Sequence, residues 1–189
     1  MAIDPSNFYP INVADTCSVW NVLSSKLLYS AAKAVRCDFC ITSFVQYECL
    51  VKPRNSSTAA EIELMARLRR EQSRGTFQPH SCGIDDLQDI KLLESRHNLG
   101  KGELSSIAFA MKTNQAVITD DQRARRLATE SGHARTQTTP HLLAWLIFTN
   151  RLGDSDVDVV ISENTAMGLP LATHFQKAYH MALQCRLNS

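Results

Sequence analysis

The chain lacks any apolar run long enough to cross a membrane. Its longest, Leu142 to Phe148, is far shorter than the about 20 residues that a spanning helix needs. The first residues, MAIDPSNFYP, also lack the basic and apolar regions of a secretory signal. We therefore expect a cytoplasmic protein with reduced thiols and no membrane partner.

The sequence also lacks a strong net charge. Lys and Arg number 20 and Asp and Glu number 19, which leaves a net charge of +1. A chain of this balance does not bind nucleic acid by overall basicity, so RNA binding would need a local basic patch and a metal to neutralise acidic groups. The 189 residues predict one domain, residues 1–189, with 154–189 as a C-terminal extension.

Several catalytic and metal-binding motifs are missing. The six histidines show no HExxH spacing, Gly100-Lys101-Gly102 is not a phosphate-binding loop, and no serine stands in a G-x-S-x-G turn. The Cys37–Cys40 pair is a lone CxxC, which we interpret as structural because no second pair completes a zinc site. The aspartates of Asp154–Asp158 lack the glycine and glutamate of a calcium loop, which excludes that site.

The most informative stretch is Leu99 to Ala128, which predicts a helix, a strand and a second helix. Glu103 lies in the first turn of the first helix, and Asp120 and Asp121 follow the apolar strand Ala116–Ile118. Helical spacing predicts one apolar face on each helix. That of the first helix comprises Leu104, Ile107, Ala108 and Met111, and that of the second comprises Ala124, Leu127 and Ala128. Acids at the carboxyl end of a strand lie where open α/β sheets bind ligands.

Two further acids occupy comparable places. Asp15 ends the strand that begins at Ile11, before a helix expected from about Ser18 to Ala34. Glu48 follows the strand Phe39–Phe44 and shares an apolar helical face with Phe44. A glutamate on an apolar face needs a partner, and a metal ion would supply one.

Each acid taken alone also has a purely structural interpretation. Glu103 would complement a helix dipole, and Asp120 or Asp121 would cap a helix. For any single position this is the commoner situation. The functional interpretation depends on the recurrence of acids at equivalent places along the chain.

The remaining pattern predicts an α/β fold, a three-layer α/β/α arrangement around a mostly parallel sheet. In Thr58–Arg74, a charged helix, we expect the apolar residues to face inward and the arginines outward, as a solvated face or an RNA- or partner-binding surface. The inward residues are Ile62, Met65, Ala66 and Leu68, and the outward ones are Arg67, Arg69, Arg70 and Arg74. The other expected elements are a loop or short strand in Gly75–Gly83, a helix over Asp85–Arg96, a last parallel strand in Ala134–Thr139, a helix over His141–Asn150, a short edge strand Val157–Ile161 and a helix over Thr173–Leu187.

These acids and their surroundings resemble the PIN domain, a family of metal-dependent nucleases related to type II toxin–antitoxin ribonucleases. The resemblance covers Ile11 to Phe148 and is carried by Asp15-Thr16, Tyr47-Glu48-Cys49-Leu50, the segment GELSSIAFA around Glu103, and VITDDQRARRLA around Asp120-Asp121. Many members carry aspartate in place of Glu103. Their threonine-x-aspartate pattern favours Asp121 over Asp120 as the last acid.

The resemblance implies a metal-dependent endoribonuclease with Mg²⁺ or Mn²⁺ as cofactor, RNA as substrate, an antitoxin or regulatory protein as a possible partner, and a homodimer. Asp15, Glu48, Glu103 and Asp121 would be catalytic, and these four with Asp120 would hold the metal. Thr16 and Thr119 would orient ligands, and the phosphate contacts would come from Lys52, Arg54, Lys101, Arg123 and Arg126. The alternative is a non-catalytic RNA-binding or scaffold module that retains the fold.

Overall fold

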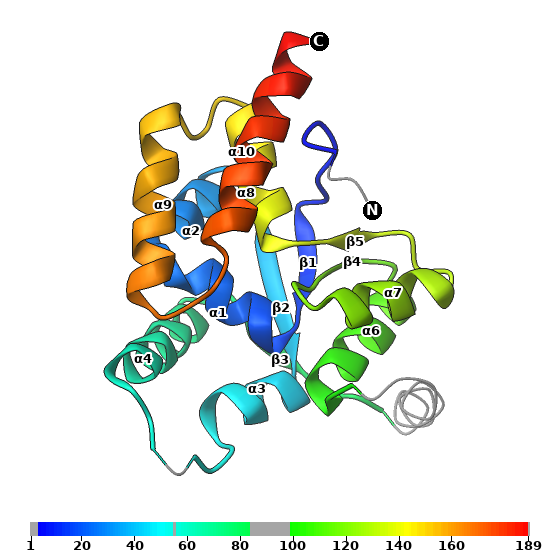
Figure 1. Cartoon of the computed structure of the whole chain (residues 1–189). Helices are drawn as coiled ribbons and strands as arrows, with labels where there is room; N and C mark the ends of the chain where they lie inside the picture. Colours follow the sequence, from blue (N-terminus) through cyan, green and yellow to red (C-terminus); the bar gives the residue numbers. More distant parts are fainter. Residues whose placement is uncertain (1–3, 55, 84–98, 189) are drawn as a thin grey trace.

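The protein is built around a five-stranded parallel sheet. The structure, a computed structural model, describes residues 4–54, 56–83 and 99–188. The strands are β1 (Ile11–Ala14), β2 (Asp38–Thr42), β3 (Gln78–His80), β4 (Ala116–Ile118) and β5 (Thr136–Gln137). They lie in the order β3-β2-β1-β4-β5 with every pair parallel (Figure 1). This confirms the predicted three-layer α/β/α class.

Helices cover both faces of this sheet. Val13 of β1 packs with the apolar sides of α6 (Lys101–Thr113) and α7 (Gln122–Glu130) on one face. Its neighbour Ala14 belongs to the larger core on the other face, because successive side chains of a strand point to opposite sides. That core includes residues of α1 (Thr16–Ser24), α2 (Lys26–Ala34), α3 (Ser43–Leu50), α4 (Ala59–Ser73), α8 (Thr139–Phe148), α9 (Asp154–Ala166) and α10 (Ala172–Leu187).

The order of the strands fixes where a ligand can bind. The chain adds β2 and β3 on one side of β1, then returns to add β4 and β5 on the other. The carboxyl ends of β1 and β4 are therefore adjacent at a topological switch point, where open α/β sheets bind their ligands. Ala14 pairs with Ile118, so Asp15 and Thr119 leave the sheet side by side.

Two predicted elements are wrong. The single helix expected from Ser18 to Ala34 is divided at Ser25, whose hydroxyl accepts a bond from the Leu28 amide and donates to Glu163, starting α2 anew. The edge strand expected at Val157–Ile161 lies instead within α9. That helix begins where the Asp156 carboxylate accepts the Gly153 amide, a bond of 2.7 Å. The helix expected over residues 85–96 lies outside the described residues.

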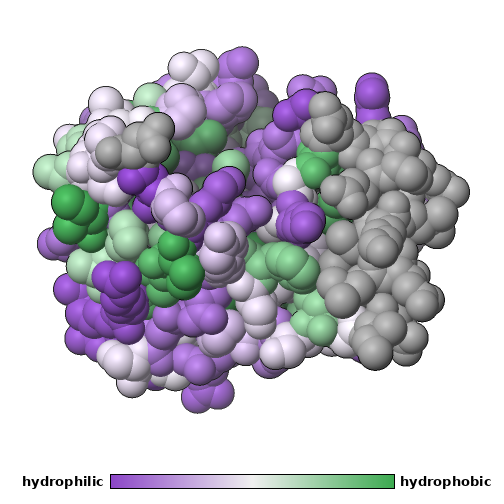
Figure 2. All heavy atoms as spheres, turned by 90° about the horizontal axis from the view of Figure 1, so that it is seen from below, coloured by the Kyte–Doolittle hydropathy of each residue, from purple (hydrophilic) through white to green (hydrophobic). Residues whose placement is uncertain are grey.

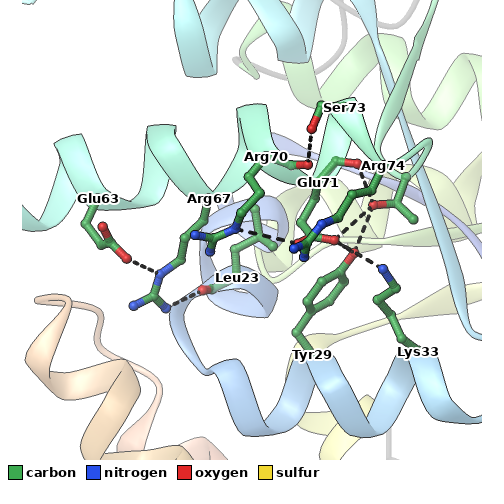
Figure 3. Close-up of polar contacts among 10 residues, drawn as sticks. Leu23, Tyr29, Lys33, Glu63, Arg67, Arg70, Glu71, Ser73 and Arg74 are labelled. Carbon is green, nitrogen blue, oxygen red and sulfur yellow. Dashed lines mark hydrogen bonds and ion pairs between the residues drawn. The ribbon is translucent and has the colours of Figure 1, made fainter.

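The buried face of α4 also differs from the prediction. Ile62 is 58% exposed and Ala66 is exposed, whereas Leu64 and Arg67 are buried. Arg67 is drawn inward because its guanidinium donates to the Leu23 carbonyl, at 2.8 Å, near the end of α1 (Figure 3). A charged side chain that satisfies backbone carbonyls can replace an apolar one at such a position. Met111 of α6, also expected inward, is 38% exposed.

The C-terminal helices complete the larger core. Val157 and Val160 of α9 and Phe175 and Ala178 of α10 are buried with α2 and α8. Both described helices of residues 154–189, which we predict as an extension, thus contribute side chains to the core. None of the described helices is long and apolar enough to cross a membrane.

Candidate metal centre

Asp15 lies at the centre of the carboxyl edge of the sheet. It caps α1, where its Oδ1 accepts the Ser18 amide at 2.8 Å, and its Oδ2 accepts the Thr119 hydroxyl at 2.5 Å. The residue is fully buried. Burial raises the pKa of its carboxyl to about 7, although these hydrogen bonds act in the opposite direction. An ionised Asp15 is therefore poorly solvated by its surroundings.

Glu48 reaches the same region from α3. Its Oε2 accepts the Thr16 hydroxyl at 2.5 Å, and its Oε1 accepts the Gly102 amide at the start of α6, at 3.1 Å. The absence of a side chain at residue 102 makes room for this carboxylate, because a Cβ atom there would collide with Glu48 Oε2. The two threonines that we expected to orient ligands, Thr16 and Thr119, therefore donate to two of the acids.

Several of the acids lie near enough to Cys17 to affect its thiol. Desolvation, and then the negative charges of Asp15, Glu103, Asp120 and Asp121, raise the pKa of this thiol to about 12. Glu103 lies half-buried in the first turn of α6, as predicted. The structure thus brings acids that follow β1 and β4, and one from α6, around the beginning of α1.

The two members of the Asp120–Asp121 doublet are held differently. Both oxygens of Asp120 accept hydrogen bonds, at 2.6–3.3 Å, from the Asn21 amide, the Ser18 hydroxyl, and the Thr139 amide and hydroxyl. Asp120 therefore ties α1 and α8 to the end of β4.

Asp121 instead caps α7 with its Oδ1, which accepts the Arg123 and Ala124 amides. No described residue donates a hydrogen bond to its Oδ2, which lies 3.9 Å from the Arg123 guanidinium. One oxygen of Asp121 thus accepts no described hydrogen bond, and the preference for Asp121 that the resemblance implies stays a prediction.

This cluster has few compensating positive charges. No described Lys or Arg forms an ion pair with Asp15, Glu48, Glu103 or Asp120. Within residues 4–54, 56–83 and 99–188, however, no three His, Cys, Asp or Glu side chains are grouped closely enough to hold a metal ion as they stand. The acids are therefore gathered at one edge without forming a ready-made cage.

The donor set fits a hard divalent cation. The acids offer carboxylate oxygens, which suit Mg²⁺ or Mn²⁺. Asp15 accepts hydrogen bonds from neutral donors only, and a cation beside it would offset the cost of burying its charge.

The predicted phosphate-binding residues lie in different settings. Lys52, Lys101, Arg123 and Arg126 are exposed. Arg54 is half-buried, and its guanidinium donates to the Glu48 and Cys49 carbonyls, at 3.1 and 3.4 Å. Its described contacts therefore stabilise the end of α3.

Sequence reasoning named Thr16 and Thr119 but missed the other residues that orient the acids. Ser18 contacts both Asp15 and Asp120, and Asn21 and Thr139 complete the surroundings of Asp120. Arg125 donates to the Thr119 carbonyl at 3.0 Å and fixes the end of β4. Only Ser18 carried a local signal, because a residue three positions after a capping aspartate commonly donates its amide to it.

Comparison with known proteins identifies one family. A protein-family model described as a PIN domain matches residues 12–144, from β1 into α8. The searches of curated proteins and of solved structures return no match. The matched span contains every acid of the cluster.

Proposed function

This chain belongs to the PIN-domain family, and we propose that it is an endoribonuclease that uses Mg²⁺ or Mn²⁺. PIN domains are generally nucleases, and they typically use divalent metals. The observation that carries the proposal is the gathering of acids at the carboxyl ends of β1 and β4 without a described cationic partner for Asp15, Glu48, Glu103 or Asp120. A fully buried carboxylate such as Asp15 is costly to retain in its ionised form unless it binds something positive.

Hydrolysis of a phosphodiester requires an activated water and relief of the negative charge on the phosphate. A bound divalent ion supplies both, because it lowers the pKa of water and neutralises phosphate oxygens. In our proposal Asp15, Glu48, Glu103 and Asp121 hold this ion, with Asp120 close by. The attacking water adds to phosphorus, and the bond from phosphorus to the leaving ribose oxygen breaks.

The chain's own residues prepare this arrangement before substrate binds. Thr119 holds Asp15, while Thr16 and Gly102 hold Glu48, so the two carboxylates keep fixed orientations. In our proposal Glu48 and Glu103 also position the attacking water and accept its proton. Preorganised groups of this kind lower the barrier because they need no rearrangement during the reaction.

The experiment is cleavage of a mixed RNA pool by wild-type protein with Mn²⁺, with EDTA, and by Asp15→Asn. The matched control is Asp158→Asn, which changes an exposed aspartate of α9, a helix that contributes no acid to the cluster. We expect cleavage that requires Mn²⁺ and Asp15 and is unaffected in the control. Cleavage that survives Asp15→Asn would refute the assignment, and RNA binding without any cleavage would favour the non-catalytic module.

The resemblance further suggests a toxin-type nuclease, active as a homodimer and restrained by an antitoxin. Expression of the wild-type chain would then arrest growth, and expression of Asp15→Asn would not. Growth unaffected by a chain that cleaves RNA in vitro would leave a nuclease without the toxin role.

A further inference from the structure

A pocket of about 560 Å³ adjoins the carboxylate cluster. It lies between α3 and the first turn of α6, and its lining includes Phe44, Tyr47, Glu48, Lys52 and Lys101. Glu48 is shared, since the same carboxylate bonds to Thr16 within the cluster. A ligand in this pocket would therefore lie directly beside the proposed reaction centre. Its size is that of typical small-ligand sites in proteins.

The pocket presents an aromatic surface. Tyr47 is 48% exposed although it lies on a helix that packs against α6. No described residue forms a hydrogen bond with its hydroxyl. Phe44, one helical turn earlier, is half-buried and packs against the core formed by α6 and α7, which supports it from behind. Exposed rings that are held in place from one side act as stacking platforms for nucleobases.

Two lysines bring positive charge to the pocket beside the carboxylates. Lys52 follows the end of α3 and Lys101 begins α6, so they line the pocket from its two elements. Both are exposed, and neither forms an ion pair with a described residue. Figure 2 views the molecule from the end that carries α3, where hydrophobic and hydrophilic residues are intermixed. Aromatic rings flanked by cations suit a base together with its adjoining phosphates.

We infer that this pocket binds an unpaired nucleobase of the substrate, stacked on Tyr47, while Lys52 and Lys101 contact the neighbouring phosphates. The inference rests on the proposed function and adds to it a base-binding site between α3 and α6, beside the proposed metal centre. A base paired within a duplex cannot enter the pocket, because it must first leave its stack. The phosphate next to the bound base would then reach Glu48 and the other acids.

Binding is measured by fluorescence anisotropy with the full chain carrying Asp15→Asn, which separates binding from cleavage. The probes are a fluorescein-labelled mixed-sequence single-stranded RNA and the same RNA annealed to its complement. On this background we add Tyr47→Ala, Tyr47→Phe, Lys52→Ala or Lys101→Ala. Lys177→Ala, at an exposed position of α10, is the matched control.

We expect Tyr47→Ala to weaken single-strand binding roughly 5- to 100-fold. Tyr47→Phe keeps the ring and should bind as the parent does. Each pocket lysine removed should lower the slope of log affinity against log salt by about 0.7, the value for one phosphate contact on a single strand. Lys177→Ala should leave that slope unchanged, and the duplex should bind more weakly than the single strand.

The inference would be overturned if Tyr47→Ala bound as tightly as its Asp15→Asn parent, or if Tyr47→Phe lost as much affinity as Tyr47→Ala. Equal affinity for duplex and single strand would overturn it too. The proposed function is tested separately by cleavage with Asp15 intact. If the wild-type chain cleaves RNA and Tyr47→Ala cleaves it equally well, only the pocket assignment fails. If the wild-type chain neither binds nor cleaves RNA, both fail.

Discussion

The Glu48 carboxylate occupies the space that a side chain at Gly102 would need. Its Oε2 lies within collision distance of a Cβ atom built there, and the Thr16 hydroxyl lies 2.9 Å from the same point. The Gly102 amide meanwhile donates to Glu48 Oε1 at 3.1 Å. A glycine at the start of α6 therefore allows an acid from α3 to contact the backbone closely.

Gly102→Ala should consequently impair cleavage with little loss of stability. We expect about a 100-fold loss of activity, because displacement of a catalytic group by about 1 Å has effects of that size. The unfolding free energy should change by less than about 1 kcal/mol, since alanine favours the helix by a similar amount. Gly153→Ala, where a Cβ has no neighbour closer than 3.7 Å, is the control and should retain full activity.

Removal of the Thr119 hydroxyl should affect both stability and activity. Thr119→Val leaves the buried Asp15 carboxylate without its shortest hydrogen bond, which should cost about 1–3 kcal/mol in urea unfolding. Activity should fall about 10- to 100-fold, as for other groups that orient metal ligands. Thr119→Ser keeps the hydroxyl and should remain near wild type. A loss in Thr119→Ser as large as that in Thr119→Val would contradict this assignment to the hydroxyl, because serine keeps it and valine does not.

The two aspartates of the doublet should respond differently to amide substitution. Asp120→Asn places an amide group among four donors and should lower the unfolding free energy by about 2–3 kcal/mol. Asp121→Asn should change it by less than about 0.5 kcal/mol, because asparagine caps helices as well as aspartate does. Of these two variants, only Asp121→Asn should remain folded yet lose the stabilisation that Mn²⁺ gives to the wild-type protein. The reverse pattern would assign the metal to Asp120.

Glu71 of α4 should make stability depend on pH. The residue is 4% exposed and accepts bonds from Tyr29, Lys33 and Arg74 (Figure 3). Burial raises the pKa of its carboxyl, but these donors outweigh burial and lower it below the ordinary 4.5. The ionised form is thus favoured by folding, so its contribution is present above pH 4.5 and disappears as pH falls through the lowered pKa.

Glu71→Gln should therefore cost about 1–3 kcal/mol in urea unfolding at pH 7 and progressively less in acid. Glu63→Gln is a matched control on the same helix, because Glu63 also pairs with an arginine but its side chain is 45% exposed. That change should cost less than about 1 kcal/mol. A difference between Glu71→Gln and wild type that grows below pH 4.5 would contradict this account. RNA cleavage should be unaffected in either variant.

The elements that frame the site follow from local patterns, and the details that orient it do not. The strand Ala116–Ile118 is readable as a short apolar run with a clear boundary, and the apolar face of α7 is readable from its helical period. Gly132, which ends α7 with a positive φ of 85°, was likewise predictable from its residue type.

Features that depend on distant parts of the chain were not readable. The division at Ser25 depends on Glu163, and the burial of Arg67 depends on carbonyls at the end of α1. Asp120 contacts Asn21, which lies 99 residues earlier in the chain, and Thr139, which lies 19 residues later. No local sequence pattern indicates contacts between such distant residues. The acids and two of their partners, Thr16 and Thr119, could thus be named from the sequence, whereas the partners of Asp120 could not.

The most direct test of the account is a titration of Mn²⁺ followed by electron paramagnetic resonance, in which free Mn²⁺ gives the signal. Wild-type protein and Asp158→Asn should both remove Mn²⁺ from solution, and Asp15→Asn should remove far less at the same protein concentration. The predicted result would place the divalent ion at the carboxylates around Asp15. Equal removal by wild type and a folded Asp15→Asn would contradict the claim that this cluster is a metal centre.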